Sequence, residues 1–319
     1  MTGVELDLLE RKLLFVTGKG GVGKSTVAAA LATLGADHGK RTLVCEVDAK
    51  GDLADFLETS PLRFEPREVH PGLFAMTMDT EASLREYLRL QLKVPLLARI
   101  GPLARTFDFV ANAAPGVKEI LIVGKLAYEV RERNYDLVVV DAPASGHIVG
   151  QLGAPQAINE LVRVGLVREQ TGWVRDILAD PARTGVVIVA APEEMPVNET
   201  LELRDRLARD TQVTLAAIVV NRVLPELFGR GEEELFERLR EPEALEALED
   251  IVDGAVEPVF EAARLAVTMR RTRAGHLTRL REGVDAGLPL LYVPYLFARA
   301  QGLRATKQVA EALGAELGF

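Results

Sequence analysis

The sequence predicts an α/β fold in which helices cover a doubly wound, mostly parallel β-sheet. Three observations favour this fold class. Short apolar runs of strand length recur along the 319 residues, and segments with helical periodicity separate them. A glycine-rich segment joins the first apolar run directly to the first helical segment. The composition, 48% hydrophobic and 27% charged, is typical of a globular protein with a sizeable core.

The first predicted strand, residues 13–16, leads into a glycine loop and then into a helix that we expect to end near Gly39. Gly18, Gly23, Lys24 and Ser25 meet the spacing Gly-x4-Gly-Lys-Ser of a phosphate-binding P-loop. We expect Lys24 to reach the β- and γ-phosphates of a nucleotide and Ser25 to ligate Mg2+. The residues predicted to bind the nucleotide here are Gly20, Gly21, Val22, Gly23, Lys24, Ser25 and Thr26.

The second predicted strand, residues 43–47, ends at three aspartates, Asp48, Asp52 and Asp55. Carboxylates at the end of a strand beside a P-loop can orient water or support Mg2+. A solvated acidic turn is the alternative for any one of them.

Residues 73–78 form the next predicted strand, and residues 80–133 have helical periodicity interrupted by prolines. This stretch is too long for a simple crossover, so we interpret it as a helical insertion. It is also more apolar than one buried helix face requires. Packing onto the core and a groove for an apolar partner are both open interpretations.

Residues 136–141 form an apolar run that ends in a carboxylate, the pattern in which Asp141 would hold a water on Mg2+. The loop that follows contains Gly146 and His147. We expect Gly146 to allow a sharp change of backbone direction, which suits a nucleotide-sensing switch. His147 could bind phosphate, contact a second subunit or be satisfied within its own loop.

Further strands are predicted at 185–190, 214–220 and 288–293, and helices at 155–178, 198–209 and 303–317. Asn221 follows one of these strands, where its amide could read the adenine edge or simply form a turn. Residues 224–287 are helical and strongly charged, and we interpret them as a second insertion. The prediction is therefore one domain over 1–319, with both insertions forming a helical subdomain.

Charge and cysteine usage exclude several classes of function. The formal net charge is −9 and the pI about 5.2, which argues against general affinity for nucleic acid. Cys45 is the one cysteine, so neither a disulfide within the chain nor a cysteine-built zinc site is possible. The sequence has no apolar run long enough for a signal peptide or a transmembrane helix, so we expect a cytoplasmic protein without direct membrane insertion.

Four separated segments resemble the arsenical-pump ATPase family, which also contains the ATPase that targets tail-anchored membrane proteins. Residues 141–147, Asp-Ala-Pro-Ala-Ser-Gly-His, resemble the family's Asp-Thr-Ala-Pro-Thr-Gly-His switch II. Residues 115–119 resemble its Pro-Gly-x-x-Glu segment, and Val220-Asn221 its adenine-contacting Val-Asn. Pro294 fits the adenine loop before the last helix.

The resemblance implies a Mg2+-dependent ATPase that closes as a dimer around ATP. Lys19 marks the deviant P-loop class, in which this second lysine reaches across the dimer interface to the partner's nucleotide. The family's switch I reads Asp-Pro-Ala-His-x-x-x-Asp, which makes Asp55 the water-orienting residue and places Asp48 near Mg2+. Ala49 and Gly51 replace Pro and His here, so Asp52 is a rival for the water-orienting role. The implied catalytic residues are Lys19, Lys24 and Asp55, and the implied metal residues are Ser25, Asp48 and Asp141.

Two departures from the family narrow the expected function. The cysteine cluster that binds arsenite is absent, so arsenite transport is not expected. The Cys-x-x-Cys zinc bridge of the eukaryotic tail-anchor-targeting dimers is absent as well. We expect a homodimer, or a heterodimer with a paralogue, that couples ATP hydrolysis to handling of a protein or transport partner. The alternative is a weakly hydrolysing, nucleotide-gated chaperone for apolar helices.

Overall fold

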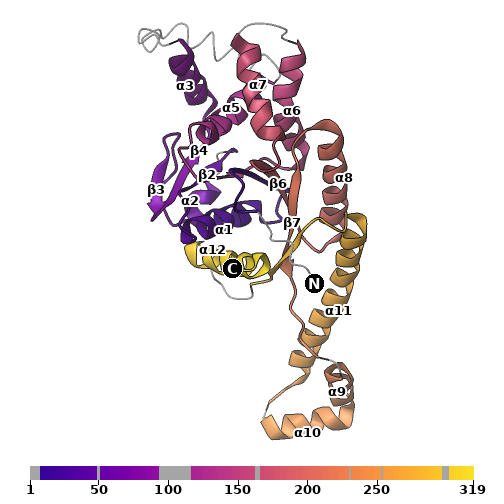
Figure 1. Ribbon diagram of the computed structural model, residues 1–319. Helices are drawn as coiled ribbons and strands as arrows, with labels where there is room; N and C mark the ends of the chain where they lie inside the picture. The colour runs from indigo at the N-terminus through magenta and orange to yellow at the C-terminus, as the bar shows by residue number, and fades with distance from the viewer. Residues whose placement is uncertain are drawn as a thin grey trace.

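The computed structural model describes residues 8–48, 51–92, 116–161, 166–229, 231–252, 254–296 and 302–319. Its centre is a β-sheet with helices packed on both faces (Figure 1). The strands are β1 (Leu13–Gly18), β2 (Thr42–Glu46), β3 (Arg67–His70), β4 (Leu73–Thr77), β5 (Leu137–Asp141), β6 (Thr184–Ala190), β7 (Leu215–Val223) and β8 (Leu290–Pro294). The predicted α/β fold is confirmed.

The strand order is β3-β4-β2-β5-β1-β6-β7-β8, and every neighbouring pair is parallel except β3 with β4. The chain places β2 to β5 on one side of β1 and β6 to β8 on the other side. The order of the strands therefore reverses at β1, which is doubly wound topology. In such sheets ligands bind outside the carboxyl ends of the strands, where the order reverses. The loop that follows β1 lies at that position.

Alternate residues of the central strands supply two apolar cores, one on each face of the sheet. Phe15, Val138 and Ile188 belong to one core, and Leu14, Val139 and Val187 to the other. The first face is covered by helices α5 (Val117–Arg131), α6 (Ser145–Leu161), α7 (Leu166–Ala179) and α8 (Glu194–Asp210). The second face is covered by helices α1 (Lys24–Asp37), α2 (Asp52–Phe56) and α12 (Gly302–Leu317).

Helix α6 differs from the sequence prediction. It begins at Ser145 and continues through Pro155, which we had expected to start the helix. Gly146 and His147 consequently lie in its first turn, and Gly146 is not among the glycines with positive φ. The sharp turn expected at Gly146 is therefore wrong. Pro155 is tolerated inside the helix at the cost of one backbone hydrogen bond.

The two predicted insertions lie on different sides of the molecule. From the first insertion the structure describes α3 (Thr80–Leu92) and α5, which pack on each other; residues 93–115 lie outside the described part. The second insertion forms α9 (Glu232–Leu239), α10 (Pro242–Val252) and α11 (Glu257–Gly283), an arm that projects away from the sheet and from α3 (Figure 1). The helical subdomain that we expect from both insertions stays a prediction, because residues 93–115 lie outside the described part of the chain.

The arm has very little core of its own. Among its described residues, α10 has no buried side chain and α11 buries only Leu280. Helix α11 packs on α8 near its carboxyl end and thereby connects the arm to the body. In the described parts of the chain, no helix combines the length and apolar character required to cross a bilayer.

Candidate nucleotide-binding site

A cavity of about 300 Å³ opens at the carboxyl ends of β1, β2 and β5. Residues of the P-loop and a group of acidic side chains line it together. The described lining residues are Gly20, Gly21, Gly23, Lys24, Ser25, Thr26, Glu46, Asp48, Asp52, Phe56, Asp141, Ala142 and Arg222. All the predicted nucleotide-binding residues of the P-loop except Val22, which is buried, thus line one cavity together with three of the predicted acids.

The glycines of the P-loop have backbone conformations that other residues rarely adopt. Gly21 and Gly23 have φ values of 85° and 95°, in the left-handed region. At Gly18, with φ 148°, a Cβ atom would lie 2.2 Å from the carbonyl oxygen of Val189 on β6. Gly23 is the N-cap of α1 and gives it no side-chain hydrogen bond, so the first amides of α1 face the cavity uncapped. This arrangement suits the binding of phosphate.

Two side chains at the start of α1 add to this part of the cavity. Lys24 donates a hydrogen bond from Nζ to the backbone oxygen of Lys19 at 3.3 Å, which bends its amine back over the loop. The Ser25 hydroxyl acts on Asp141 and lowers the pKa of that carboxyl. Lys24 and Ser25 both line the cavity, and their roles in phosphate and metal binding stay predictions.

Glu46 and Asp141 form a buried acidic pair in the same cavity. They are register partners at the ends of β2 and β5, and both are nearly inaccessible to solvent. The pKa of Asp141 is raised to about 6, because burial, with a smaller contribution from the neighbouring Glu46, outweighs the lowering by Ser25 and Lys24. Glu46 Oε1 and Asp141 Oδ1 are buried without a hydrogen-bond partner.

These orphaned oxygens fit a hard cation such as Mg2+. Within the described ranges no group of three or more His, Cys, Asp or Glu side chains is arranged to hold a metal by itself. That agrees with the way Mg2+ is usually bound, through one or two carboxylates together with phosphate and water. Sequence reasoning missed Glu46, because it lies inside the predicted strand 43–47 and nothing in the local pattern gives it a role at a site.

The switch I aspartates separate into two groups. Asp48 and Asp52 line the cavity. Asp55, one turn further along α2, is exposed and is not among the lining residues. Gly51 holds this segment to the buried acids, because its backbone N–H donates to Glu46 Oε2 at 3.2 Å. The geometry of this chain thus favours Asp52 over Asp55 as the residue that faces a bound nucleotide.

The residues predicted to contact adenine lie just beyond the cavity. Asn221 is buried and donates from Nδ2 to the backbone oxygen of Val22 at 2.9 Å, so it supports the P-loop. Pro294 pairs in register with Val223 at the end of β8 and does not line the cavity. Their contact with adenine stays a prediction.

Arg222 is a cavity residue that sequence reasoning missed. The register between β7 and β8 shifts between Val220 and Val223, and Arg222 has a φ of 61°. A bulge of this kind redirects a side chain, and here it brings a guanidinium to a cavity rich in carboxylates. Apart from Lys24, Arg222 is the only cationic side chain among the described lining residues.

Lys19 does not point into its own cavity. Its Nζ lies 2.5 Å from Glu199 Oε1 and 3.2 Å from Met195 Sδ, both on α8, and Lys19 is not a lining residue. His147 is exposed in the first turn of α6. Neither side chain has a described contact with the cavity of the same chain.

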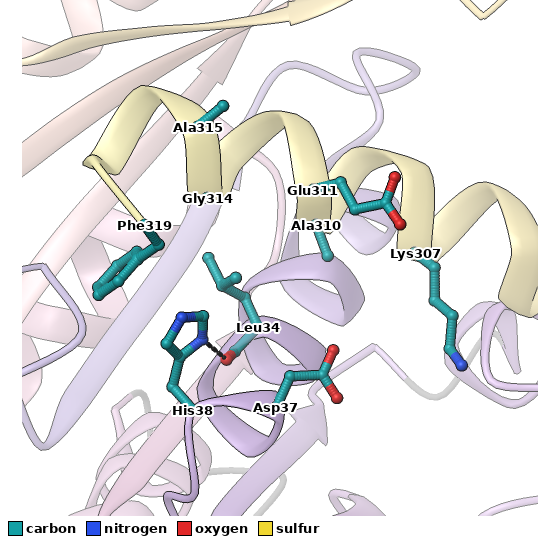
Figure 2. A pocket seen from close by; sticks show the side chains of 9 residues that line it. All are labelled: Leu34, Asp37, His38, Lys307, Ala310, Glu311, Gly314, Ala315 and Phe319. Carbon is teal, nitrogen blue, oxygen red and sulfur yellow. Dashed lines mark hydrogen bonds between the residues drawn. The ribbon is translucent and has the colours of Figure 1, made fainter.

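A second pocket lies far from this site, where the carboxyl end of α1 meets α12 (Figure 2). His38 Nδ1 donates a hydrogen bond to the Leu34 carbonyl oxygen at 2.8 Å, and the His38 ring lies against Phe319. Asp37, Lys307 and Glu311 lie around the rim (Figure 2). This pocket has no glycine loop and no helix N-terminus, so it lacks the features that suit phosphate.

Comparison with known proteins agrees with this geometry. The family model for anion-transporting ATPases matches residues 11–170 and 164–254. The ATPase BagA of Mycobacterium tuberculosis is 32% identical over 236 residues, which is 70% of this chain and 67% of that protein. An ATPase ASNA1 homolog of Cryptosporidium parvum is 27% identical over 274 residues, 75% of this chain and 73% of that protein.

The family match extends over well more than half of the chain and includes the P-loop, the strand that ends at Asp141 and the adjoining switch segment. The resemblance stated from the sequence is confirmed. The chain belongs to the anion-transporting ATPase family and is an ATP hydrolase.

Proposed function

We propose that this ATPase is a Mg2+-dependent nucleotide switch that works as a dimer and couples ATP hydrolysis to the handling of a protein or transport partner. The observation that carries the proposal is the cavity in which the uncapped start of α1, Lys24 and the buried acids Glu46 and Asp141 face one another. An ATP triphosphate requires cations and amides on one side and a magnesium-binding group on the other.

Each residue has a distinct role in the proposed mechanism. The P-loop amides and Lys24 bind the phosphates and neutralise their charge. Ser25 and Asp141 would hold Mg2+, which when bound would withdraw charge from the phosphate oxygens. Arg222 adds a second positive charge at the mouth of the cavity. Asp48 lies beside the phosphates near the metal, and Asp52 orients the attacking water.

Lys19 supplies the test of the dimer. We expect Lys19→Ala to retain nucleotide binding by the single chain, because Lys19 does not line its own cavity. ATP turnover should fall by about 10²–10³-fold, the loss typical when one charge-stabilising group is removed from a transition state. Nucleotide binding and steady-state phosphate release measure the two effects separately.

Lys40→Ala is the matched control, since Lys40 also pairs with a glutamate, Glu10, at 2.7 Å but lies at the opposite end of α1. It should leave turnover unchanged. Wild-type turnover in Lys19→Ala would contradict the trans-lysine role.

Two substitutions can decide whether Asp52 or Asp55 orients the attacking water. Asp52→Asn should lower turnover by about 10²-fold or more, because it removes a carboxylate that lines the cavity. Asp55→Asn should have a much smaller effect, since Asp55 is exposed outside the cavity. Steady-state kinetics of both variants decide the order, and the reverse order would restore Asp55 as the water-orienting residue.

A specific observation favours the chaperone alternative. Several large hydrophobic side chains of the arm and its base are exposed: Leu227, Leu235, Ile251, Val252, Val259, Leu265 and Met269. Exposed apolar surface on this scale is typical of a site for a protein partner. A weakly hydrolysing chaperone would show slow turnover that an apolar helical peptide stimulates, whereas a robust ATPase would turn over without the peptide.

Arsenite transport is not part of the proposal. The chain has a single cysteine, Cys45, which is fully buried in β2, and burial raises the pKa of its thiol. A soft trivalent metalloid requires several accessible thiolates.

A further inference from the structure

A single carboxylate on α8 connects the P-loop to the switch segment. Glu199 Oε1 pairs with Lys19 Nζ at 2.5 Å, and Glu199 Oε2 accepts a hydrogen bond from Ser145 Oγ at 3.5 Å. Ser145 begins α6 and lies four residues after Asp141. The two contacts join the P-loop, α6 and α8, which are far apart in the sequence, and α6 begins three residues after Ala142, which lines the nucleotide cavity.

The position of Lys19 explains why this connection matters. In the single chain its amine is directed to Glu199 on α8, away from the cavity that its own loop encloses. To reach phosphate in another subunit, the amine must leave Glu199. A triphosphate and a carboxylate thus compete for the same cation.

The ion pair has the properties of a reversible contact. The Lys19 and Glu199 side chains are 24% and 35% exposed, so solvent reaches both partners. An exposed ion pair shifts an equilibrium by only about two- to fivefold, which a polyanionic nucleotide can outcompete. Met195 lies beside the pair and is 61% exposed. Because a methionine side chain is flexible, it can move aside when the Lys19 amine leaves Glu199.

We propose that Glu199 is a positioning residue that holds Lys19 within its own subunit and releases it when a second subunit presents bound triphosphate. This inference rests on the proposed dimeric function. The Ser145 contact gives the switch segment a means to act on the same carboxylate, because movement of α6 after nucleotide binding removes one of the hydrogen bonds that hold Glu199.

The test is the dependence of ATP turnover on protein concentration. Glu199→Gln keeps the size of the side chain and removes its charge, so Lys19 is held less tightly. The protein concentration for half-maximal turnover should fall by about two- to fivefold for each ion pair released, while nucleotide affinity of the dilute chain stays unchanged. Glu199→Asp, which keeps the charge, should behave nearly as the wild type.

Two further variants make the result specific. Glu202→Gln removes an exposed carboxylate on the same helix and should change nothing. In a Lys19→Ala background, Glu199→Gln should have no additional effect, because its partner is gone. A purely structural role for Glu199 would instead lower the thermal midpoint and persist in that background.

The outcomes separate this inference from the proposed function. If Lys19→Ala turns over normally, the dimeric mechanism fails. If Lys19→Ala is inactive but Glu199→Gln matches the wild type at every protein concentration, only the role of Glu199 is overturned. If Glu199→Gln is as inactive as Lys19→Ala at saturating protein, Glu199 does not restrain Lys19 and the inference is also overturned.

Discussion

Replacing Lys24 with alanine should lower ATP turnover by about 10³-fold, and it should also weaken nucleotide binding. Lys24 lies inside the cavity, and its amine is held over the loop by the Lys19 carbonyl. Removal of this cation leaves the phosphates opposite Glu46, Asp48, Asp52 and Asp141 with less compensation, so both the bound state and the transition state lose stabilisation. Turnover and equilibrium nucleotide binding measure the two losses.

Lys307→Ala is the matched control for this experiment. It removes the same charge from the rim of the second pocket, where α12 lies against the carboxyl end of α1 (Figure 2), whereas the P-loop precedes the amino end of α1. Its turnover should equal that of the wild type. If Lys24→Ala binds and hydrolyses ATP as the control does, then the cavity described here is not the nucleotide site.

The contrast between Lys19→Ala and Lys24→Ala follows from where the two lysines point. Both belong to the same loop, yet one amine lines the cavity and the other is paired with Glu199. Loss of Lys24 should therefore affect nucleotide binding by the single chain, whereas loss of Lys19 should affect only a step that requires a second chain.

The sequence predicts the central sheet because its strands are apolar on both faces. Parallel strands covered by helices on both sides form continuous apolar runs, and β1, β5 and β6 have this character. The edge strand β3 was missed because Arg67-Glu68-Val69-His70 is polar and partly exposed, which leaves no hydrophobic period.

The candidate site was predictable where a motif dictates local backbone structure. The P-loop and Asp141 are such cases, because spacing and strand ends determine where their groups lie. Glu46 and Arg222 were not predictable in this way. Glu46 becomes part of the site only through its register with Asp141, and Arg222 only through a bulge between β7 and β8. Register and bulges are tertiary properties that no local sequence pattern specifies.

The largest effect on folding is expected at Lys125, which lies in the first insertion and away from the cavity. Its Nζ is 2.7 Å from a Glu86 oxygen and 2.6 Å from a Glu129 oxygen, so α5 is tied to α3 through a buried cation. The Phe64 ring lies 5.2 Å from the same nitrogen. Burial lowers the pKa of Lys125, but the hydrogen bonds to Glu129 and Glu86 outweigh burial and raise it, so the amine stays charged.

Lys125→Met should lower the free energy of unfolding by about 3–5 kcal/mol, because it leaves two carboxylates close together and unpaired in a largely buried position. Denaturant-induced unfolding measures the change. Lys118→Met, on the exposed face of the same helix, is the control and should change stability little.

A triple variant tests whether unpaired charge, rather than lost packing, causes this destabilisation. Adding Glu86→Gln and Glu129→Gln to Lys125→Met replaces both carboxylates with neutral amides of the same size. The amide oxygen at position 129 can still accept the hydrogen bond that Asn134 Nδ2 donates to Glu129 at 2.7 Å in the wild type. Stability should therefore recover in part, although three residues now differ from the wild type. If the triple variant is less stable than Lys125→Met alone, the carboxylates contribute through packing and hydrogen bonds, and electrostatic neutralisation by Lys125 is not what holds α3 against α5.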